Sequence, residues 1–255
     1  MTSNNTPEQN KFVKRLVPYM WPWSTPSGGQ YKSFLSWIYS RKFSIFYVLA
    51  ILVVNLIFGF APRRHCWEGD WNIVFQCNWM MWMAQFKEDF WHFMATSMTT
   101  IWFHNDFVHI LFVILFGFLF PVQSFEAQHG TKKTLVVYFL SYVCIALFMG
   151  SLFTYLIETF PNNEVVLKGF SRAWMGGSVG VFALIAALGY YSTRKWFLFS
   201  MIFAFEVFNH FILGNNIYIS FIHIMSGVFG WLTIWGWEII ADRKENAKLK
   251  AIKAN

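Results

Sequence analysis

A serine and a histidine lie inside long apolar runs of this sequence, and together they suggest acyl-transfer chemistry. Ser178 follows a pair of glycines, and His223 lies 45 residues later. A hydroxyl within hydrogen-bond reach of an imidazole is the minimum for a nucleophile with its general base. Polar groups are costly inside apolar segments, so each of these two residues is a candidate for function.

Glycines surround this serine, at Gly176, Gly177 and Gly180. They allow a tight turn and the close approach of another backbone. Ser178 would then open a helix whose free N–H groups and dipole favour a developing oxyanion. The alternative is purely structural, because small residues also form packing seams between membrane helices. A lone histidine in a span can likewise serve only as an interhelical hydrogen-bond partner.

Another ionisable pair, Glu206 and His210, lies in an apolar run with Asn209 beside it. The two residues are four apart and therefore share one helical face. A metal or proton-relay site, a buried hydrogen-bonded pair and a contact with another subunit all fit this spacing. Two ligands are too few for a metal site, so we expect no metal. A transporter or channel built on this pair lacks the second broken helix or internal repeat of such proteins.

The elements that must position these residues are apolar runs of about 20 residues, long enough to cross a bilayer as helices. Six such runs cover residues 43–61, 107–125, 134–157, 174–191, 196–213 and 217–237. Hydrophobic residues make up 56% of the 255 positions and charged residues only 13%. That charge content is about half of the value for a soluble domain. The sequence therefore predicts an all-α membrane protein with six transmembrane helices.

The distribution of Lys and Arg orients these spans, since loops on the cytoplasmic side are enriched in both. Six spans place fifteen of the 20 Lys and Arg residues on one side, together with both termini. The five on the other side are Arg63, Arg64, Lys87, Lys168 and Arg172. An odd number of spans would remove this bias. The net charge of +7 is explained by these loops, so we expect no nucleic-acid partner.

A single membrane domain accounts for most of the chain. We expect an inner-side N-terminal tail at 1–42, part of it along the membrane surface, and a membrane domain at 43–239. A basic inner-side tail follows at 240–255. The outer loop at 62–106 is rich in Trp, Met and Phe. We therefore expect it to lie in the interface or to pack on the bundle.

Two of the three cysteines, Cys66 and Cys77, fall in this outer loop. The outer side is oxidising in a bacterial or secretory setting, so a disulfide between them can form there. Cys144 lies in the middle of an apolar run, where we expect it to serve only in packing.

Four segments resemble the motifs of the rhomboid family of intramembrane serine proteases. They are HNDFVHILF at 104–112, EAQHG at 126–130, GGSVGVFAL at 176–184 and HIMSGVFG at 223–230. The first is similar to the family's His-x-x-x-x-His stretch that opens the second helix, and the second to its Glu-x-x-x-Gly in the following loop. The third is similar to the family's Gly-x-Ser-Gly segment, and the fourth to its His-x-x-Gly-x-x-x-Gly segment in the sixth helix. The matching fold-motif residues are His104, Glu126, Gly130, Gly176, Gly180, Gly227 and Gly230.

The resemblance implies the six-helix rhomboid-like bundle and a Ser–His dyad, without a third carboxylate. Ser178 would be the nucleophile, and His223 the general base and then the acid. His109 and the backbone N–H of Ser178 would help to form the oxyanion hole, supported by Gly177. Phe182 would pack against the catalytic histidine. No cofactor is implied.

Two positions depart from the family pattern. Val113 stands where the family often has an asparagine that donates to the oxyanion, and Val179 stands where a glycine follows the serine. Loss of one oxyanion donor costs about 10²–10³ in rate, and a β-branched residue crowds a tight turn. Two functions therefore stay open. One is a protease that cleaves transmembrane substrates near the outer interface. The other is an inactive rhomboid-like protein that binds transmembrane helices or is a structural subunit of a membrane complex.

The expected partners follow from these two functions. They are membrane lipids, with either a transmembrane-helix substrate or partner membrane proteins. We expect a multi-pass protein of a prokaryotic plasma membrane, with an organellar inner membrane as the alternative. Both termini would lie on the positively charged, cytoplasm-like side.

Overall fold

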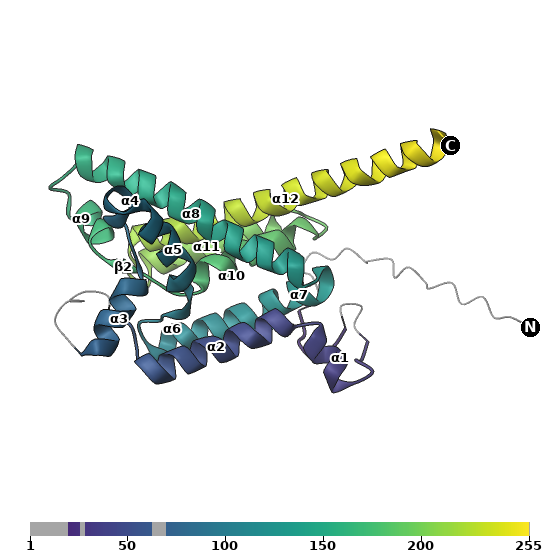
Figure 1. Cartoon of the computed structure of the whole chain (residues 1–255), viewed down its shortest axis with the longest axis horizontal. Coiled ribbons are helices and arrows are strands. Elements are labelled where there is room, and N and C mark those ends of the chain that lie inside the picture. The colour runs from purple at the N-terminus through teal and green to yellow at the C-terminus, as the bar shows by residue number, and fades with distance from the viewer. Residues whose placement is uncertain (1–19, 26–28, 63–69, 255) are drawn as a thin grey trace, which may run out of the picture.

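The computed structural model describes residues 20–25, 29–62 and 70–254, and these residues are mostly helical (Figure 1). The apolar helices are α2 (Lys42–Phe58), α6 (Phe107–Phe112), η2 (Val113–Val122), α7 (Gln123–His129), α8 (Thr131–Thr159), α10 (Ser178–Tyr190), α11 (Phe197–Phe211) and α12 (Ile217–Ala254). The remaining elements are α1 (Phe34–Tyr39), α3 (Trp71–Trp79), β1 (Met81–Trp82), α4 (Gln85–Glu88), α5 (Phe90–Thr99), η1 (Thr100–Trp102), α9 (Glu164–Phe170) and β2 (Ala173–Trp174).

Three helical segments within the described residues are long and apolar enough to cross a membrane. They are the continuous run α6–η2–α7, helix α8, and residues 217–250 of α12. Helices α2, α10 and α11 are also apolar but shorter. These six segments coincide with the six predicted runs. The all-α membrane fold is thereby confirmed, whereas the exact number of spans stays a prediction.

Several predicted span boundaries differ from the structure by a few residues, and two of these differences have a clear physical cause. The fourth run was expected to begin at residue 174, but Trp174 lies in β2 and the helix begins at Ser178. The sixth run was expected to end at residue 237, but α12 continues to Ala254. The basic segment after Trp237 contains no Gly or Pro and is rich in Ala, Glu, Lys and Arg, which are strong helix formers.

The connections between the helices gather at two ends of the molecule. One end carries α1, the turn between α7 and α8, and the projecting C-terminal part of α12, while α3, α4 and α9 lie at the opposite end (Figure 1). The segments that the charge distribution assigns to the two sides of the membrane are therefore separated in space. This separation supports the predicted alternation of loops, while the orientation in a membrane stays a prediction.

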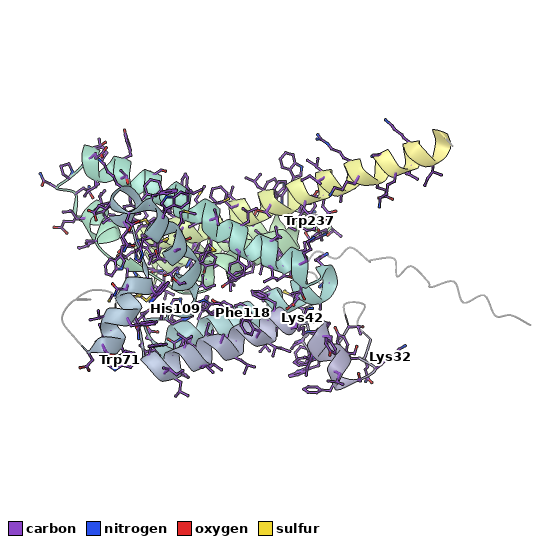
Figure 2. All side chains as sticks on the ribbon, in the orientation of Figure 1. Lys32, Lys42, Trp71, His109, Phe118 and Trp237 are labelled. Carbon is purple, nitrogen blue, oxygen red and sulfur yellow. The ribbon has the colours of Figure 1, made fainter. Side chains whose placement is uncertain are left out.

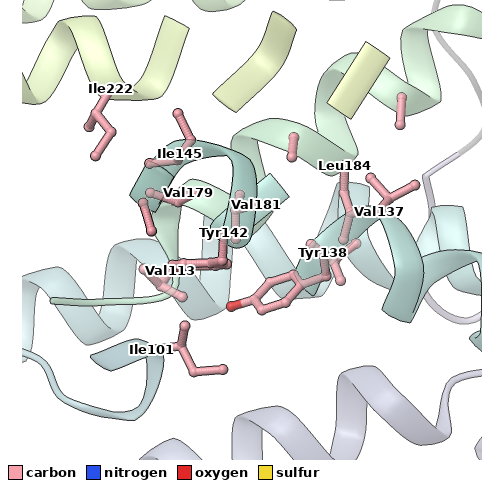
Figure 3. Packing of buried hydrophobic residues seen from close by; sticks show 14 of the residues in the cluster. Ile101, Val113, Val137, Tyr138, Tyr142, Ile145, Val179, Val181, Leu184 and Ile222 are labelled. Atoms are coloured by element: carbon pink, nitrogen blue, oxygen red, sulfur yellow. The ribbon is translucent and has the colours of Figure 1, made fainter. Parts of the chain in front are cut away.

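Helix α10 lies at the centre of the bundle and is nearly enclosed by other helices. Figure 3 shows Val179, Val181 and Leu184 of α10 among side chains of α8 and α12. A Cβ on Gly230 of α12 would lie 2.2 Å from the backbone oxygen of Ala183. Only a glycine permits this approach, so the small residues of α12 place it directly against α10.

The other predicted glycines serve neighbouring contacts. A Cβ on Gly180 would enter the ring of Tyr138 on α8, so this glycine brings α10 close to α8. The atoms nearest to an added Cβ on Gly227 belong to Phe199 on α11. The motif glycines of α12 therefore face two different helices.

Glu126 joins α7 to the beginning of α2. Its carboxylate accepts hydrogen bonds from the backbone N–H of Phe43 at 2.9 Å and of Ser44 at 2.8 Å. The hydroxyl of Thr131 donates to the same carboxylate at 2.7 Å. A negative charge at a helix N-terminus satisfies free N–H groups and complements the helix dipole. Gly130, with φ of 83°, ends α7 beside this contact and lets the chain turn into α8.

The predicted outer loop packs on the bundle. Its strand β1 pairs antiparallel with β2, in the register Met81 with Trp174, and Phe93 of α5 is fully buried. Trp71 lies at the rim of this end, whereas His109 and Phe118 lie among the helices (Figure 2). Residues 63–69 of the loop lie outside the described residues.

The cysteines of the predicted disulfide lie in this loop. Cys77 is buried and forms a disulfide. Cys66, the partner that the sequence suggests, lies outside the described residues, so the pairing itself stays a prediction. Cys144 is a free thiol in α8.

Candidate active site

Ser178 and His223 meet where the N-terminal ends of α10 and α12 lie side by side. Ser178 is the first residue of α10, and His223 lies in the second turn of α12. The Oγ of Ser178 and the Nε2 of His223 are 3.0 Å apart. This separation falls within the range of about 2.6–3.2 Å for a nucleophile and its general base. Ser178 is 8% exposed, so little water competes for the contact.

The imidazole of His223 is also held on two further sides. Its Nδ1 lies 2.7 Å from Oε1 of Glu206, a fully buried carboxylate on α11. Phe182, one helical turn after Ser178, stacks on the imidazole with ring centroids 4.3 Å apart. The family resemblance implies a dyad that uses no third carboxylate, yet the structure places the carboxylate of Glu206 against the histidine.

Glu206 and His210 do not pair with each other, although they share a helical spacing. The Nδ1 of His210 lies 2.7 Å from the backbone oxygen of Asn215, in the link between α11 and α12. Asn209 donates to Oε2 of Glu206 at 3.4 Å. Across the described ranges no group of three or more His, Cys, Asp or Glu side chains is placed to hold a metal ion.

The sequence did not predict the Glu206–His223 contact, because residue spacing indicates partners only along a single helix. A usable signal was present, since a buried carboxylate in a span needs a partner. Glu206 lies near the end of α11 and His223 near the start of α12, with only a short link between the helices. Two antiparallel neighbours of this kind bring such residues to similar depth.

The turn before Ser178 depends on Gly176. Its φ of 101° lies in the left-handed region, which strongly favours glycine. A Cβ at this position would also lie 2.4 Å from Cε1 of His109. The turn and the histidine ring are therefore packed so closely that only a glycine fits between them.

Two tyrosines of α8 fix the direction of the peptide groups in this turn. Tyr142 donates to the carbonyl of Gly176 at 2.5 Å, and Tyr138 donates to the carbonyl of Gly177 at 3.3 Å. In a trans peptide the N–H points opposite to the carbonyl. The N–H of Ser178 is therefore directed away from Tyr138.

His104 supports the same turn from the opposite side. The N–H of Gly177 donates to its Nε2 at 3.4 Å, and the histidine is fully buried. Burial and, to a smaller extent, the neighbouring His109 lower the pKa of His104 to about 3. A neutral imidazole is required here, because a protonated one has no acceptor nitrogen to offer.

His109 is positioned by the loop that opens α6. The carboxylate of Asp106 accepts the backbone N–H of His109 at 2.7 Å and so caps the helix. Asn105 donates to the same carboxylate, and its Oδ1 lies 2.9 Å from Nδ1 of His109. The ring of His109 is thereby held over Gly176, beside the start of α10.

The two departures from the family pattern have different consequences. Val113 is 1% exposed and packs in the hydrophobic core, so this position offers no hydrogen-bond donor. Val179 lies inside α10, one residue after the helix begins. The expected crowding of the turn at Val179 is wrong, because the unusual backbone angle falls on Gly176, before the serine.

A cavity of about 500 Å³ opens beside Ser178 and His223. Apolar side chains such as Phe205 and Ile222 form much of its wall, and Arg172 lies in its lining. The guanidinium of Arg172 is held over the ring of Tyr218, 5.5 Å from the ring centroid. Cavities of this size bind small ligands or a few side chains, with a small number of polar groups that fix orientation.

A family model of the rhomboid domain matches residues 87–237, more than half of the chain. This chain belongs to the rhomboid family. Searches of curated proteins and of solved structures gave no match. In this rhomboid the matched region begins in the outer loop and ends in α12, so it contains the whole cluster from His104 to His223. Helices α1, α2 and α3 precede it.

Proposed function

We propose that this rhomboid is an intramembrane serine protease that cleaves transmembrane substrates with Ser178 and His223. The observation that carries the proposal is the 3.0 Å contact between Ser178 Oγ and His223 Nε2. The Oγ attacks the substrate carbonyl carbon while Nε2 takes the hydroxyl proton. The imidazole then gives this proton to the leaving amine, and water releases the acyl group by the same steps.

The start of α10 supports this chemistry electrostatically. A helix N-terminus offers unpaired N–H groups and the positive end of the dipole. The N–H of Ser178 has a fixed direction, because Tyr138 holds the preceding carbonyl. We assign this N–H and His109 to the oxyanion, with Gly177 as part of the supporting turn.

A transmembrane helix is the substrate that fits the site. The protein is embedded in lipid, and the cavity beside Ser178 is lined largely by apolar side chains. With both termini on the cytoplasm-like side, the N-terminal ends of α10 and α12 face the outer leaflet. Cleavage then occurs near the outer interface. We also propose a prokaryotic plasma membrane as the location, with the basic loops and tails on its cytoplasmic side.

A fluorophosphonate probe tests this function directly, because it reacts with an activated serine. Wild-type protein in mild detergent should be labelled and should cleave a single-span reporter, whereas Ser178→Ala and His223→Ala should do neither. Ser171→Ala is the matched control, since Ser171 is an exposed serine seven residues earlier. Wild-type protein that is folded but neither labels nor cleaves any single-span reporter would refute the proposal.

One observation favours the alternative function, an inactive rhomboid that binds transmembrane helices or is a subunit of a membrane complex. The buried Val113 removes a donor that active relatives often use. This alternative predicts stable co-purification with partner membrane proteins, unchanged by Ser178→Ala or His223→Ala. It also predicts no serine labelling, so one set of variants separates the two functions.

A further inference from the structure

Glu206 makes a contact that the proposed reaction does not yet use. Its Oε1 lies 2.7 Å from Nδ1 of His223, on the side of the imidazole opposite to Ser178. The side chain of Glu206 is fully buried, and that of His223 is 12% exposed. A charge-assisted hydrogen bond of this length in a desolvated place strongly orients both partners.

The contact determines which nitrogen of His223 carries the proton. An ionised carboxylate can only accept hydrogen bonds, so Nδ1 must be the donor. Nε2 of the neutral ring then holds the lone pair and accepts the hydroxyl of Ser178. This is the one tautomer in which His223 can act as the general base.

Two neighbouring side chains hold the pair formed by Glu206 and His223. Asn209 donates to its second oxygen, Oε2, at 3.4 Å. Phe182 stacks on the imidazole that Glu206 contacts, so rotation of the ring away from the carboxylate is blocked. The contact joins α11 to α12, and Ser178 joins the same imidazole to α10.

We propose that Glu206 is a positioning residue that converts the Ser–His pair into a Ser178–His223–Glu206 triad. The inference rests on the proposed function. When the bond between Oγ and the carbonyl carbon forms, the hydroxyl proton moves to Nε2 and the ring becomes an imidazolium. Glu206 stays ionised and stabilises this cation through Nδ1–H. The proton leaves with the amine as the peptide C–N bond breaks, and Glu206 takes up no proton at any step.

A structural role alone would give different kinetics. If Glu206 only joined α11 to α12, its loss would lower thermal stability and disturb substrate binding and turnover together. A positioning role acts through His223, which has no part in ground-state binding. It predicts a fall in kcat with an unchanged KM.

The test compares Glu206→Gln and Glu206→Asp with the wild type on a single-span reporter. Glu206→Gln should lower kcat by roughly 10²- to 10⁴-fold with KM within about twofold. Glu206→Asp keeps the charge and should recover part of the loss. Glu158→Gln is the matched control, because Glu158 is an exposed carboxylate at the rim of the molecule, where it pairs with Lys87 at 2.6 Å. It should leave kcat unchanged.

Nuclear magnetic resonance of ¹⁵N-histidine-labelled protein gives a readout that does not depend on turnover or on the stability of the variants. The His223 signal, assigned by its loss in His223→Ala, should show a protonated Nδ1 with a far-downfield proton. In Glu206→Gln that proton should move upfield. A wild-type His223 protonated on Nε2 instead would overturn the inference.

The outcomes separate this inference from the proposed function. An active wild type with unchanged kcat in Glu206→Gln overturns the triad and leaves the protease intact. A fall in kcat matched by an equal loss of substrate binding also overturns it, in favour of a structural role. A wild type that neither labels nor cleaves refutes the protease, and the triad with it.

Discussion

At the scale of single residues, the proposed nucleophile depends on a turn whose decisive residue lies two positions before it. Gly176 has the left-handed backbone angle, and its missing side chain leaves room for the ring of His109. One residue therefore shapes the turn before Ser178 and leaves room for His109 beside the proposed oxyanion site. A side chain at this position would move two parts of the site at once.

We expect Gly176→Ala to lower kcat by about 10²-fold, because a displacement of about 1 Å at the reacting atoms costs that much. The measurement is cleavage of a single-span reporter by protein of verified fold. Gly59→Ala is the control, because Gly59 also has a positive φ but has nothing within 4 Å of the added Cβ. Equal kcat values for the two variants would show that the close approach of Gly176 to His109 does not affect turnover.

The sequence predicted the residues of the site that stand in short motifs, and it named Glu206 as a candidate but not its contact with His223. Ser178 and His223 were identified from residue type, spacing and resemblance, and the structure brings them together at 3.0 Å. Glu206 has no motif, and its one-turn neighbour His210 was a misleading partner. Helix rotation decides whether such a carboxylate faces its own helix neighbour or the next helix, and a local pattern does not contain that rotation.

At the scale of elements, the contact between α10 and α12 decides the distance from Ser178 to His223. Gly230 lies two turns after His223 on the same helix and touches the backbone of Ala183. Because the two helices approach through backbone atoms there, even one added methyl group must push them apart. A larger separation of α10 and α12 should therefore change the distance from Ser178 to His223 and also lower the stability of the bundle.

We expect Gly230→Ala to lower the stability of the bundle by about 1–3 kcal/mol, the usual cost of overpacking. It should also reduce turnover at least about tenfold, because α12 carries His223. Gly236→Ala on the same helix is the control, since no atom lies within 4 Å of its added Cβ. Thermal unfolding in detergent and reporter cleavage measure the two effects. A Gly230→Ala variant as active and as stable as Gly236→Ala would contradict this account.

Hydropathy located the apolar helices correctly, whereas their ends needed tertiary information. The start of α10 moved to Ser178 because β2 pairs with β1 of a distant loop, and the pairing residues carry no local signal of their own. The length of α12 was underestimated, because a search for apolar runs stops at the first charged residues. Helix propensity continues past that point.

At the scale of the whole molecule, folding brings ionisable groups into places from which water is excluded. His104 is the clearest case outside the spans, because it is fully buried between the outer loop and α10. Its neutral ring accepts a hydrogen bond that holds the turn before the nucleophile. The cost of protonating this ring links the stability of the entire fold to pH.

The sign of this link follows from the two pKa values of His104. Burial and the neighbouring His109 lower the pKa to about 3 in the folded protein, whereas an unperturbed histidine has a pKa of 6.5. Between pH 6.5 and pH 3, His104 binds a proton in the unfolded chain but stays neutral in the folded protein. The contribution to stability is therefore complete above pH 6.5 and is lost as the pH falls toward 3, by up to about 1.4 kcal/mol per pH unit.

His104→Gln separates this effect from other titrations, because an amide oxygen can still accept the N–H of Gly177 but does not titrate. We expect the wild type to lose more stability than His104→Gln between pH 6.5 and 4, as measured by thermal unfolding in detergent. Identical pH dependence in the two proteins would contradict a neutral, buried His104. Loss of reporter cleavage together with stability below pH 6.5, in the wild type but not in the variant, would locate the pH-sensitive step in the turn before Ser178.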